Sequence, residues 1–310
     1  MPNQNRVPEL TTRSGSISVV REAGRTPRIV AETIYESNQR ARKGWLASFR
    51  EMTHDCIESQ DLIQQLFKRD WLMMYKKSFL GMGWHLAAPI MGIFSWVLMN
   101  ATGVLEPGDV GIPYPAYVLI STAIWGFFVA AFTQTSHVLE IAKSFIHQVG
   151  FQHHVLIVNQ WLQTLVNFGI SLAVTLIVMG FMGVFPSPLV FLFPLALLPI
   201  LFLGSAIGLI TAVIQVVAPD IKRGVTFLMG FWMYITPVIY SPKVESPFLQ
   251  AVIYWNPMTY LLGGARDLFV SGAITQPDTY GVAAGVSVLV FLVVLRVFYI
   301  SEEKVIEKMI

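Results

Sequence analysis

Four histidines have the most distinctive chemistry in this chain, because all of them lie within residues 137–154. Imidazole side chains bind transition metals, but metal sites usually combine them with cysteine or carboxylate ligands at short, regular spacings. No such spacing repeats here, and the single cysteine, Cys56, is far away in the sequence. We therefore expect polar residues at a membrane interface and no metal, with a metal site as the alternative. The histidines are His137, His147, His153 and His154.

Sequence signatures of enzymes are missing. There is no Gly-x-x-x-x-Gly-Lys-Ser/Thr loop to hold nucleotide phosphates, no Gly-x-Ser-x-Gly motif, and no His-Glu-x-x-His or Cys-x-x-Cys pair. Acidic residues deep in apolar segments, which are typical of proton-coupled carriers, are missing too. Arg296 lies near the end of the last apolar segment, where it is expected to reach the membrane surface. We expect a chain that is not an enzyme and whose driving energy comes from another protein.

The distribution of charge indicates the class of protein. The 310 residues are 54% hydrophobic and 13% charged, against about 25% charged in soluble domains. The interval 144–219 contains no Asp, Glu, Lys or Arg, although about 20 residues suffice for one helical crossing. These runs are continuously apolar and lack the alternation of barrel strands. The sequence therefore predicts an all-α polytopic membrane protein.

Gaps in charge and proline or glycine residues divide the chain into six predicted membrane spans. The connector Pro186–Pro188 splits the longest apolar run, and the segment 218–224 ends the fourth span. The predicted spans cover residues 84–103, 115–137, 155–182, 190–217, 224–241 and 279–300. Three regions follow: a basic, disordered cytoplasmic tail at 1–55, a transmembrane domain at 56–301, and a cytoplasmic C-terminal tail at 302–310.

Basic residues predict the orientation of the chain. Residues 1–77 contain 13 Lys or Arg, whereas the segments expected on the opposite side have only Lys243 and Arg266. By the positive-inside rule, both termini are expected in the cytoplasm, which agrees with an even number of spans.

Two segments outside the predicted spans carry helical patterns of their own. Apolar residues form one stripe along 57–71, which predicts an amphipathic helix at the cytoplasmic membrane interface. A helix packed on a partner protein would have the same pattern. The segment 241–278 is apolar in patches but interrupted by Pro247, Pro257 and Gly263–Gly264, and it predicts two short re-entrant helices between the fifth and sixth spans.

Aromatic residues gather in the first, second and fifth predicted spans. Aromatic belts at membrane surfaces explain part of this enrichment. The alternative is a channel lining on which the flat apolar faces of sugars stack while a polymer slides past. The candidate lining residues are Trp84, Phe94, Trp96, Phe227, Phe231, Tyr234 and Tyr240.

Three sequence patches, in this order, resemble the permease subunit of type-2 ABC exporters, specifically the branch that exports polysaccharides such as O-antigen, capsule and teichoic acid. Two departures are present: the family usually has Arg where this chain has Pro219, and residues 1–55 have no counterpart in shorter members. The patches are Arg69-Asp70 followed by Tyr75–Ser78, Leu80-Gly81, Trp84 and Pro89; Pro219-Asp220 followed by Thr236–Tyr240; and Asn256-Pro257 followed by Arg266.

The resemblance implies a set of partners. Two copies of the chain would form a channel in the cell inner membrane, in contact with membrane lipids, and a separate ABC ATPase dimer would bind ATP and magnesium. No cofactor is expected on this chain, and nucleic acid is not an expected partner. The substrate would be a polysaccharide on a lipid pyrophosphate carrier.

The resemblance also implies roles for charged residues. A coupling helix in the loop 138–154 would contact the ATPase through Glu140, Lys143 and His147. Cations at headgroup depth suit a pyrophosphate, so Arg69, Lys76 and Lys77 are candidates for loading the lipid-linked substrate. These three cations could instead serve only to orient the chain.

Other functions remain as alternatives. A type-2 ABC exporter of lipids or drugs is the nearest one. A channel or secondary carrier acting without an ATPase would need an intramembrane ionisable site, and a membrane transferase would need clustered acids or histidines at one interface. The outward acids Glu106, Asp109, Glu245, Asp267 and Asp278 are dispersed in the sequence.

Overall fold

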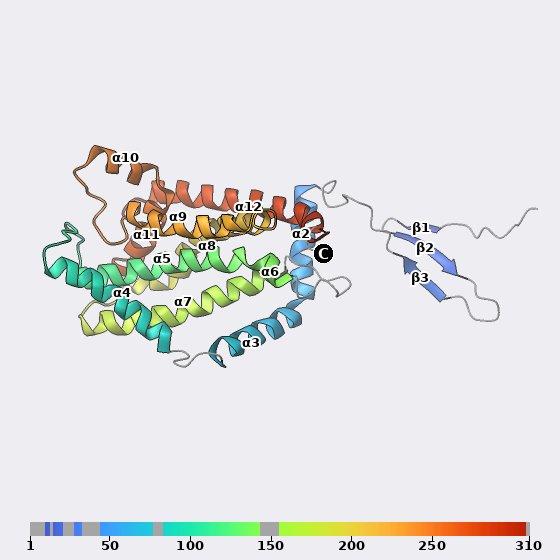
Figure 1. Cartoon of the computed structure of the whole chain (residues 1–310), viewed down its shortest axis with the longest axis horizontal. Coiled ribbons are helices and arrows are strands. Elements are labelled where there is room, and N and C mark those ends of the chain that lie inside the picture. Colours follow the sequence, from blue (N-terminus) through green and yellow to red (C-terminus); the bar gives the residue numbers. More distant parts are fainter. Residues whose placement is uncertain are drawn as a thin grey trace, which may run out of the picture. The chain divides into compact units, whose positions relative to one another are not determined.

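The computed structural model describes residues 10–12, 15–20, 28–32, 44–76, 83–142 and 155–307 (Figure 1). Side chains are described for residues 44–72, 83, 91–142 and 155–301. The chain divides into two compact units, Met1–Ser48 and Phe49–Ile310, and each is considered by itself.

The first unit contains a small antiparallel sheet with strand order β1-β2-β3. Its strands are β1 (Leu10–Thr12), β2 (Gly15–Val20) and β3 (Arg28–Glu32). Ile17 pairs with Leu10 on one side and with Ala31 on the other. β-branched residues in β2 and β3 favour extended backbone. These strands correct the expectation of an all-α chain for the residues they cover, while the disordered cytoplasmic tail stays a prediction.

Two amphipathic helices precede the first apolar helix. They are α2 (Trp45–Glu58) and α3 (Gln60–Lys76). Most of the helix predicted at 57–71 is confirmed as α3, which begins three residues later and ends five residues later, whereas residues 57 and 58 belong to α2. Helix α2 begins within the segment 1–55 that the sequence predicts to be a tail. Ile63 and Leu66 of α3 are buried, whereas Gln64 and Gln65 are exposed, as the apolar stripe predicts.

The remaining helices overlap the predicted segments, with ends displaced by up to seven residues. The span predicted at 155–182 is one helix, α7, and the re-entrant segment contains two short helices, α10 and α11. The helices are α4 (Gly83–Ala101), α5 (Tyr114–Ser136), α6 (Val138–Ala142), α7 (Val155–Phe181), η2 (Pro188–Leu192), α8 (Phe193–Ile214), α9 (Asp220–Ile235), α10 (Pro247–Trp255), α11 (Pro257–Val270) and α12 (Pro277–Glu307).

Four helical segments within the described residues are long and apolar enough to cross a membrane. They are Tyr114–Ala142, Val155–Phe181, Pro188–Ile214 and Pro277–Ser301. The helix α9 has 16 residues, fewer than the roughly 20 of an untilted crossing. It also begins four residues before the predicted span 224–241. It ends six residues before the end of that span, because Pro237 has no backbone N–H with which to continue the helical hydrogen bonds.

Helices α5 and α8 form the centre of the second unit, and α7, α11 and α12 pack around them. The contact is close because Gly204 and Gly208 of α8 face α5. A Cβ atom on Gly204 would lie 2.7 Å from the carbonyl oxygen of Phe128, and one on Gly208 would lie 2.5 Å from that of Phe132. This small-x-x-x-small spacing lets two helix backbones approach in a membrane.

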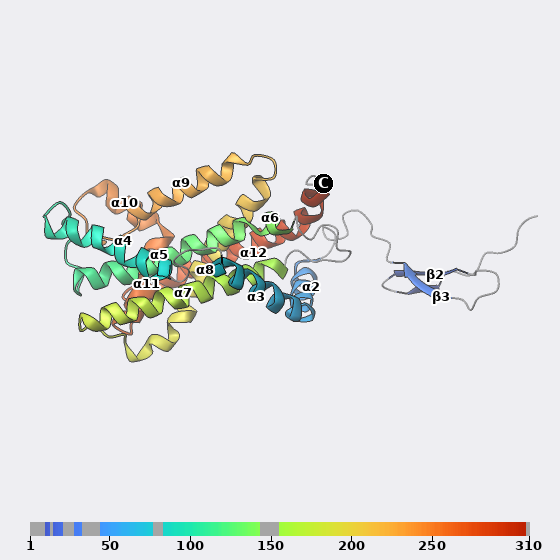
Figure 2. The ribbon, with the colours of Figure 1, turned by 60° about the horizontal axis from the view of Figure 1, so that its bottom comes forward.

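The two ends of the second unit differ in structure (Figures 1 and 2). Helix α2 runs across the end at which α12 finishes, and α6 is near this end as well. Helix α10 and the C-terminal part of α4 lie at the opposite end. Helices α6 and α10, which carry or border candidate site residues, therefore lie near opposite ends of this unit.

Candidate functional site

The Asp70 carboxylate joins the amphipathic helix α3 to α7. Its Oδ2 accepts hydrogen bonds from the side-chain amides of Asn159 and Gln163, each at 3.2 Å. Its Oδ1 accepts from Nε of Arg69 at 2.8 Å. A carboxylate with several donors forms stronger bonds than a neutral acceptor, so α3 is held against the first turns of α7.

The candidate loading cations are only partly described. Arg69 is exposed and paired with Asp70, with Nη2 2.8 Å from Oδ1. Lys76 is the last residue of α3, but its side chain is outside the described residues, and Lys77 is wholly outside them. The structure therefore places one of the three cations in an ion pair and leaves their role in loading as a prediction.

An ion cluster connects α6 to α9. The Nζ of Lys222 donates to Oε1 of Glu140 at 2.9 Å, and Nδ1 of His137 lies 2.6 Å from Oε2 of the same carboxylate. Lys222 is also 2.9 Å from that His137 nitrogen. Nδ1 of His137 cannot form both hydrogen bonds at the same time. When Nδ1 carries a proton it donates to Glu140, and when it carries none it accepts from Lys222. Of the predicted coupling residues, Lys143 and His147 lie outside the described residues.

The described candidate lining residues gather on α4 and α9. Phe227 and Phe231 are 67% and 57% exposed, and their ring centroids are 4.8 Å apart. Trp96 of α4 contacts Tyr234 of α9 edge to face at 6.3 Å. Phe94 is exposed as well, while Tyr240 bonds through its hydroxyl to the Tyr234 carbonyl. The Trp84 side chain is outside the described residues.

The opposite face of α9 packs inward. Trp232 lies edge to face against Phe128 and Trp125 of α5, at 5.4 and 6.4 Å. Its indole N–H donates to Oδ1 of Asn256 at 3.0 Å. The helix therefore has one aromatic face toward the core and another that is exposed.

Asn256 organises the turn between α10 and α11. Its Oδ1 also accepts from the backbone N–H of Met258, and its Nδ2 donates to Oγ1 of Thr236 at 2.8 Å. Asparagine is a preferred N-cap, and proline is favoured at the first helical position. The Asn256-Pro257 pair thus starts α11 and fixes it to the end of α9.

Arg266 is a buried cation that sequence reasoning placed in the re-entrant segment without assigning it a partner. It is 9% exposed, and its Nη1 donates to Oγ of Ser121 at 3.2 Å and to the Pro237 carbonyl at 3.5 Å. The guanidinium lies 4.3 Å from the ring centroid of Tyr117, a cation–π distance. Asp267 is 3.9 Å away from Nε. Arg266 thus binds α11 to α5 and to the chain after α9.

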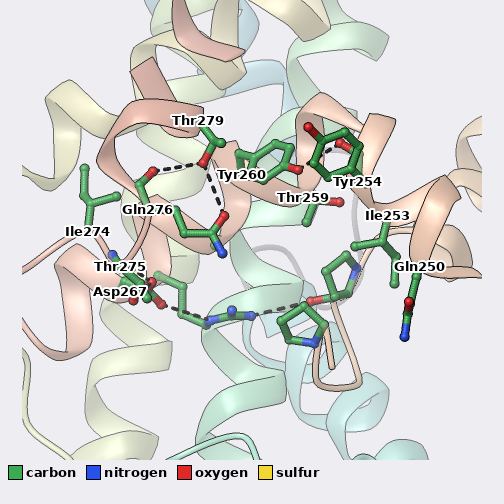
Figure 3. A pocket seen from close by; sticks show the side chains of 15 residues that line it. Gln250, Ile253, Tyr254, Thr259, Tyr260, Asp267, Ile274, Thr275, Gln276 and Thr279 are labelled. Atoms are coloured by element: carbon green, nitrogen blue, oxygen red, sulfur yellow. Dashed lines mark hydrogen bonds and ion pairs between the residues drawn. The ribbon is translucent and has the colours of Figure 1, made fainter. Parts of the chain in front are cut away.

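A pocket of about 470 Å³ opens beside Arg266 (Figure 3). Helices α10 and α11, the start of α12, and the loops before α10 and before α12 supply the walls. Burial, and to a smaller extent the neighbouring Tyr254, raises the pKa of the Tyr260 hydroxyl, which stays a donor and bonds the Tyr254 carbonyl at 2.9 Å. Other lining residues are Gln250, Thr259, Asp267, Thr275, Gln276 and Thr279.

A third polar group lies on α2. Ligand atoms of His54, Asp55 and Glu58 are all within 4.8 Å of one another. His54 and Glu58 are exposed and 3.5 Å apart at a spacing of four residues. This is the geometry of an ordinary helix-surface pair, and we assign it no function.

Long apolar helices, a central close-packed helix pair and amphipathic helices at one end define a multi-pass helical membrane protein. A family model described as ABC-2 type transporter matches residues 61–270. The match covers more than half of the chain, which therefore belongs to the ABC-2 type transporter family. The resemblance seen in the sequence is confirmed at this level, and the chain is a non-catalytic transport subunit.

Three curated relatives have the same description, "O-antigen export system permease protein RfbA". The one from Myxococcus xanthus is 23% identical over 256 residues, which cover 82% of this chain and 97% of the relative. Two from Klebsiella pneumoniae are each 21% identical, over 217 and 221 residues, and cover 69% of this chain and 82% of each relative.

Proposed function

We propose that this chain is the permease subunit of an ATP-driven exporter that moves a lipid-linked polysaccharide across the cell inner membrane. The observation that carries the proposal is the aromatic surface of α4 and α9, formed by the exposed Phe227, Phe231 and Tyr234 and by the half-buried Trp96, whose ring contacts Tyr234. Aromatic rings stack on sugar faces without requiring a fixed site. The names of the relatives support the same substrate class.

In this proposal, α4, α5, α7, α8 with η2, α9 and α12 are the six spans. Both termini lie in the cytoplasm, and α10 and α11 form the re-entrant pair on the outer side. A single copy leaves the aromatic surface exposed, and a second copy would close a channel around it. ABC-2 permeases pair with ABC ATPase subunits, so ATP and magnesium would bind to a partner ATPase dimer.

The cytoplasmic groups have separate roles in the proposal. The segment containing Glu140, Lys143 and His147 would contact the ATPase, and the bond from Glu140 to Lys222 would connect that contact to α9. Arg69, Lys76 and Lys77 would receive the pyrophosphate of the lipid carrier. The Asp70 contacts with Asn159 and Gln163 would keep α3 in place during loading.

Deletion of the gene in its host tests this function. We expect polysaccharide to accumulate on the cytoplasmic face, where a specific lectin or antibody detects it only after the cells are permeabilised. Expression of the wild-type chain should restore surface polymer, and the tagged chain should copurify with an ABC ATPase. Normal surface polymer in the deletion strain would contradict the proposal, and retention of a lipid or drug instead would favour the alternative exporter.

A further inference from the structure

We propose that the pocket beside Arg266 binds a sugar unit of the exported polymer. This inference rests on the proposed function and adds a fixed binding site at the end of the second unit where α10 lies (Figure 1). The aromatic surface on α4 and α9 belongs to other elements and does not line this pocket.

The pocket combines rings with groups that bind hydroxyls. Tyr254 and Tyr260 lie side by side on one wall, while Gln276 and Gln250 lie on opposite sides (Figure 3). Tyr254 is largely exposed, so part of its ring is available for stacking. Sugars have both apolar faces and rims of hydroxyls, and this lining offers a surface for each.

Unused hydrogen-bonding capacity is the strongest observation. Thr259 is 9% exposed, and its Oγ1 has no hydrogen-bond partner among the described residues. Arg266 is also 9% exposed, and within the described part of the chain its hydrogen bonds to Ser121 and Pro237 both use Nη1. Buried polar groups are normally paired, so the unpaired Thr259 hydroxyl fits a bound ligand, with Arg266 beside it.

The charges in the pocket favour a hydroxyl-rich ligand over a phosphate. Arg266 would attract an anion, but Asp267 lines the same pocket and lies 3.9 Å from it. Asp267 also accepts from the Thr275 backbone N–H and hydroxyl, so its negative charge is held in place. Neutral hydroxyls can donate to the carboxylate and accept from the guanidinium at once.

The size of the pocket agrees with a small part of a polymer. Its volume of about 470 Å³ lies within the range of roughly 300–1,000 Å³ that is typical of small-molecule sites. A pocket of this size at one end can hold single units in turn while the rest of the chain passes.

Binding of polymer fragments to the purified complex tests the inference. The complex of this chain with its ATPase is titrated with fragments of one repeat unit, which are prepared from the host's own polymer by partial hydrolysis of its glycosidic bonds and isolated by size. We expect saturable binding by the wild type and at least tenfold weaker binding by Thr259→Val. The matched control is Thr102→Val, because the Thr102 hydroxyl bonds its own helix at 2.9 Å and does not line the pocket.

Stability separates a binding role from a structural one. Thr259→Val keeps the side-chain shape and removes a hydroxyl that has no partner, so the unfolding midpoint should stay equal or rise by about 2–4 °C. A fall in the midpoint together with the loss of binding would assign Thr259 to folding and overturn the inference. Equal binding by both variants, or no binding by the wild type, would overturn it as well.

The outcome for the proposed function is read separately. If the wild-type complex restores surface polymer but binds no fragments, this pocket is not a sugar site and the exporter function stands. If the complex moves no polymer in cells, the proposed function itself is wrong.

Discussion

At the scale of single residues, Asp70 and Arg266 each connect elements that are far apart in the sequence. Asp70 collects three donors from Arg69, Asn159 and Gln163, and Arg266 reaches Ser121, 145 positions away. Charged groups near or in a membrane are costly unless they are paired. Both residues therefore contribute to the arrangement of helices as well as to local charge.

Asp70→Asn should destabilise the protein, because it removes the ion pair with Arg69. It also replaces the charged acceptor of the Asn159 and Gln163 amides with a neutral amide. The expected loss is about 1–3 kcal/mol in the free energy of unfolding, measured by chemical denaturation of the purified protein in detergent. Asp220→Asn is the control, since the Asp220–Arg223 pair is almost fully exposed. If both variants lose the same free energy of unfolding, the contact of Asp70 with α7 does not stabilise the protein.

At the scale of elements, two contacts between helices differ in kind. Helix α8 packs against α5 at Gly204 and Gly208. Helix α9 contacts α6 through the ion pair of Lys222 with Glu140. The first contact has no room for added atoms, since a Cβ on Gly208 meets the Phe132 carbonyl at 2.5 Å. The second is partly exposed and polar. We expect the first to be a permanent contact and the second to change during transport.

Gly208→Ala should force α5 and α8 apart, at a cost of about 1–3 kcal/mol, typical of overpacking. Gly169→Ala on α7 is the matched control, because a Cβ there meets nothing within 4 Å. Thermal unfolding of the two purified variants measures the difference. If Gly208→Ala unfolds at the same temperature as Gly169→Ala, close packing at this position does not stabilise the protein.

Reversal of charges tests the contact between α6 and α9. Glu140→Lys and Lys222→Glu should each reduce polymer export several-fold, because each places like charges in contact where Nζ and Oε1 now lie 2.9 Å apart. The double reversal should recover much of the lost export. Arg223→Glu, at an exposed position in the first turn of α9, is the control for a change of charge alone. No recovery in the double variant, measured as surface polymer at equal protein level, would exclude this pair as the connection.

At the scale of the whole molecule, the apolar runs predict most of the second unit. Val155–Phe181 agrees with its predicted span to one residue, because no proline and no charged residue interrupts it. The predicted span begins four residues after the start of α9, because the charged residues Asp220, Lys222 and Arg223 are typical of a loop between spans. Lys222 is instead paired with Glu140, and an acid at a helix N-terminus is favourable.

The sites were less predictable than the spans, because they depend on contacts between distant segments. Phe227 and Phe231 lie four positions apart in the sequence, a spacing that places them on one face of α9, and both are exposed there. No local pattern could show that Arg266 lies over Tyr117 or that the Thr259 hydroxyl stays unpaired. Likewise, the sequence shows Asn159 and Gln163 only as polar residues within a predicted span. Their hydrogen bonds to Asp70 depend on how α3 packs against α7.

The proposed exporter function requires that the aromatic surface of α4 and α9 lines the path of the polymer. A photo-crosslinking amino acid at Phe231 measures this directly in cells that make the polymer, with the same replacement at Ile177 of α7, which is 62% exposed, as the control. We predict crosslinked polymer at position 231, dependent on ATP, and none at position 177. Polymer crosslinked equally at both positions, or at neither while export continues, would contradict the account.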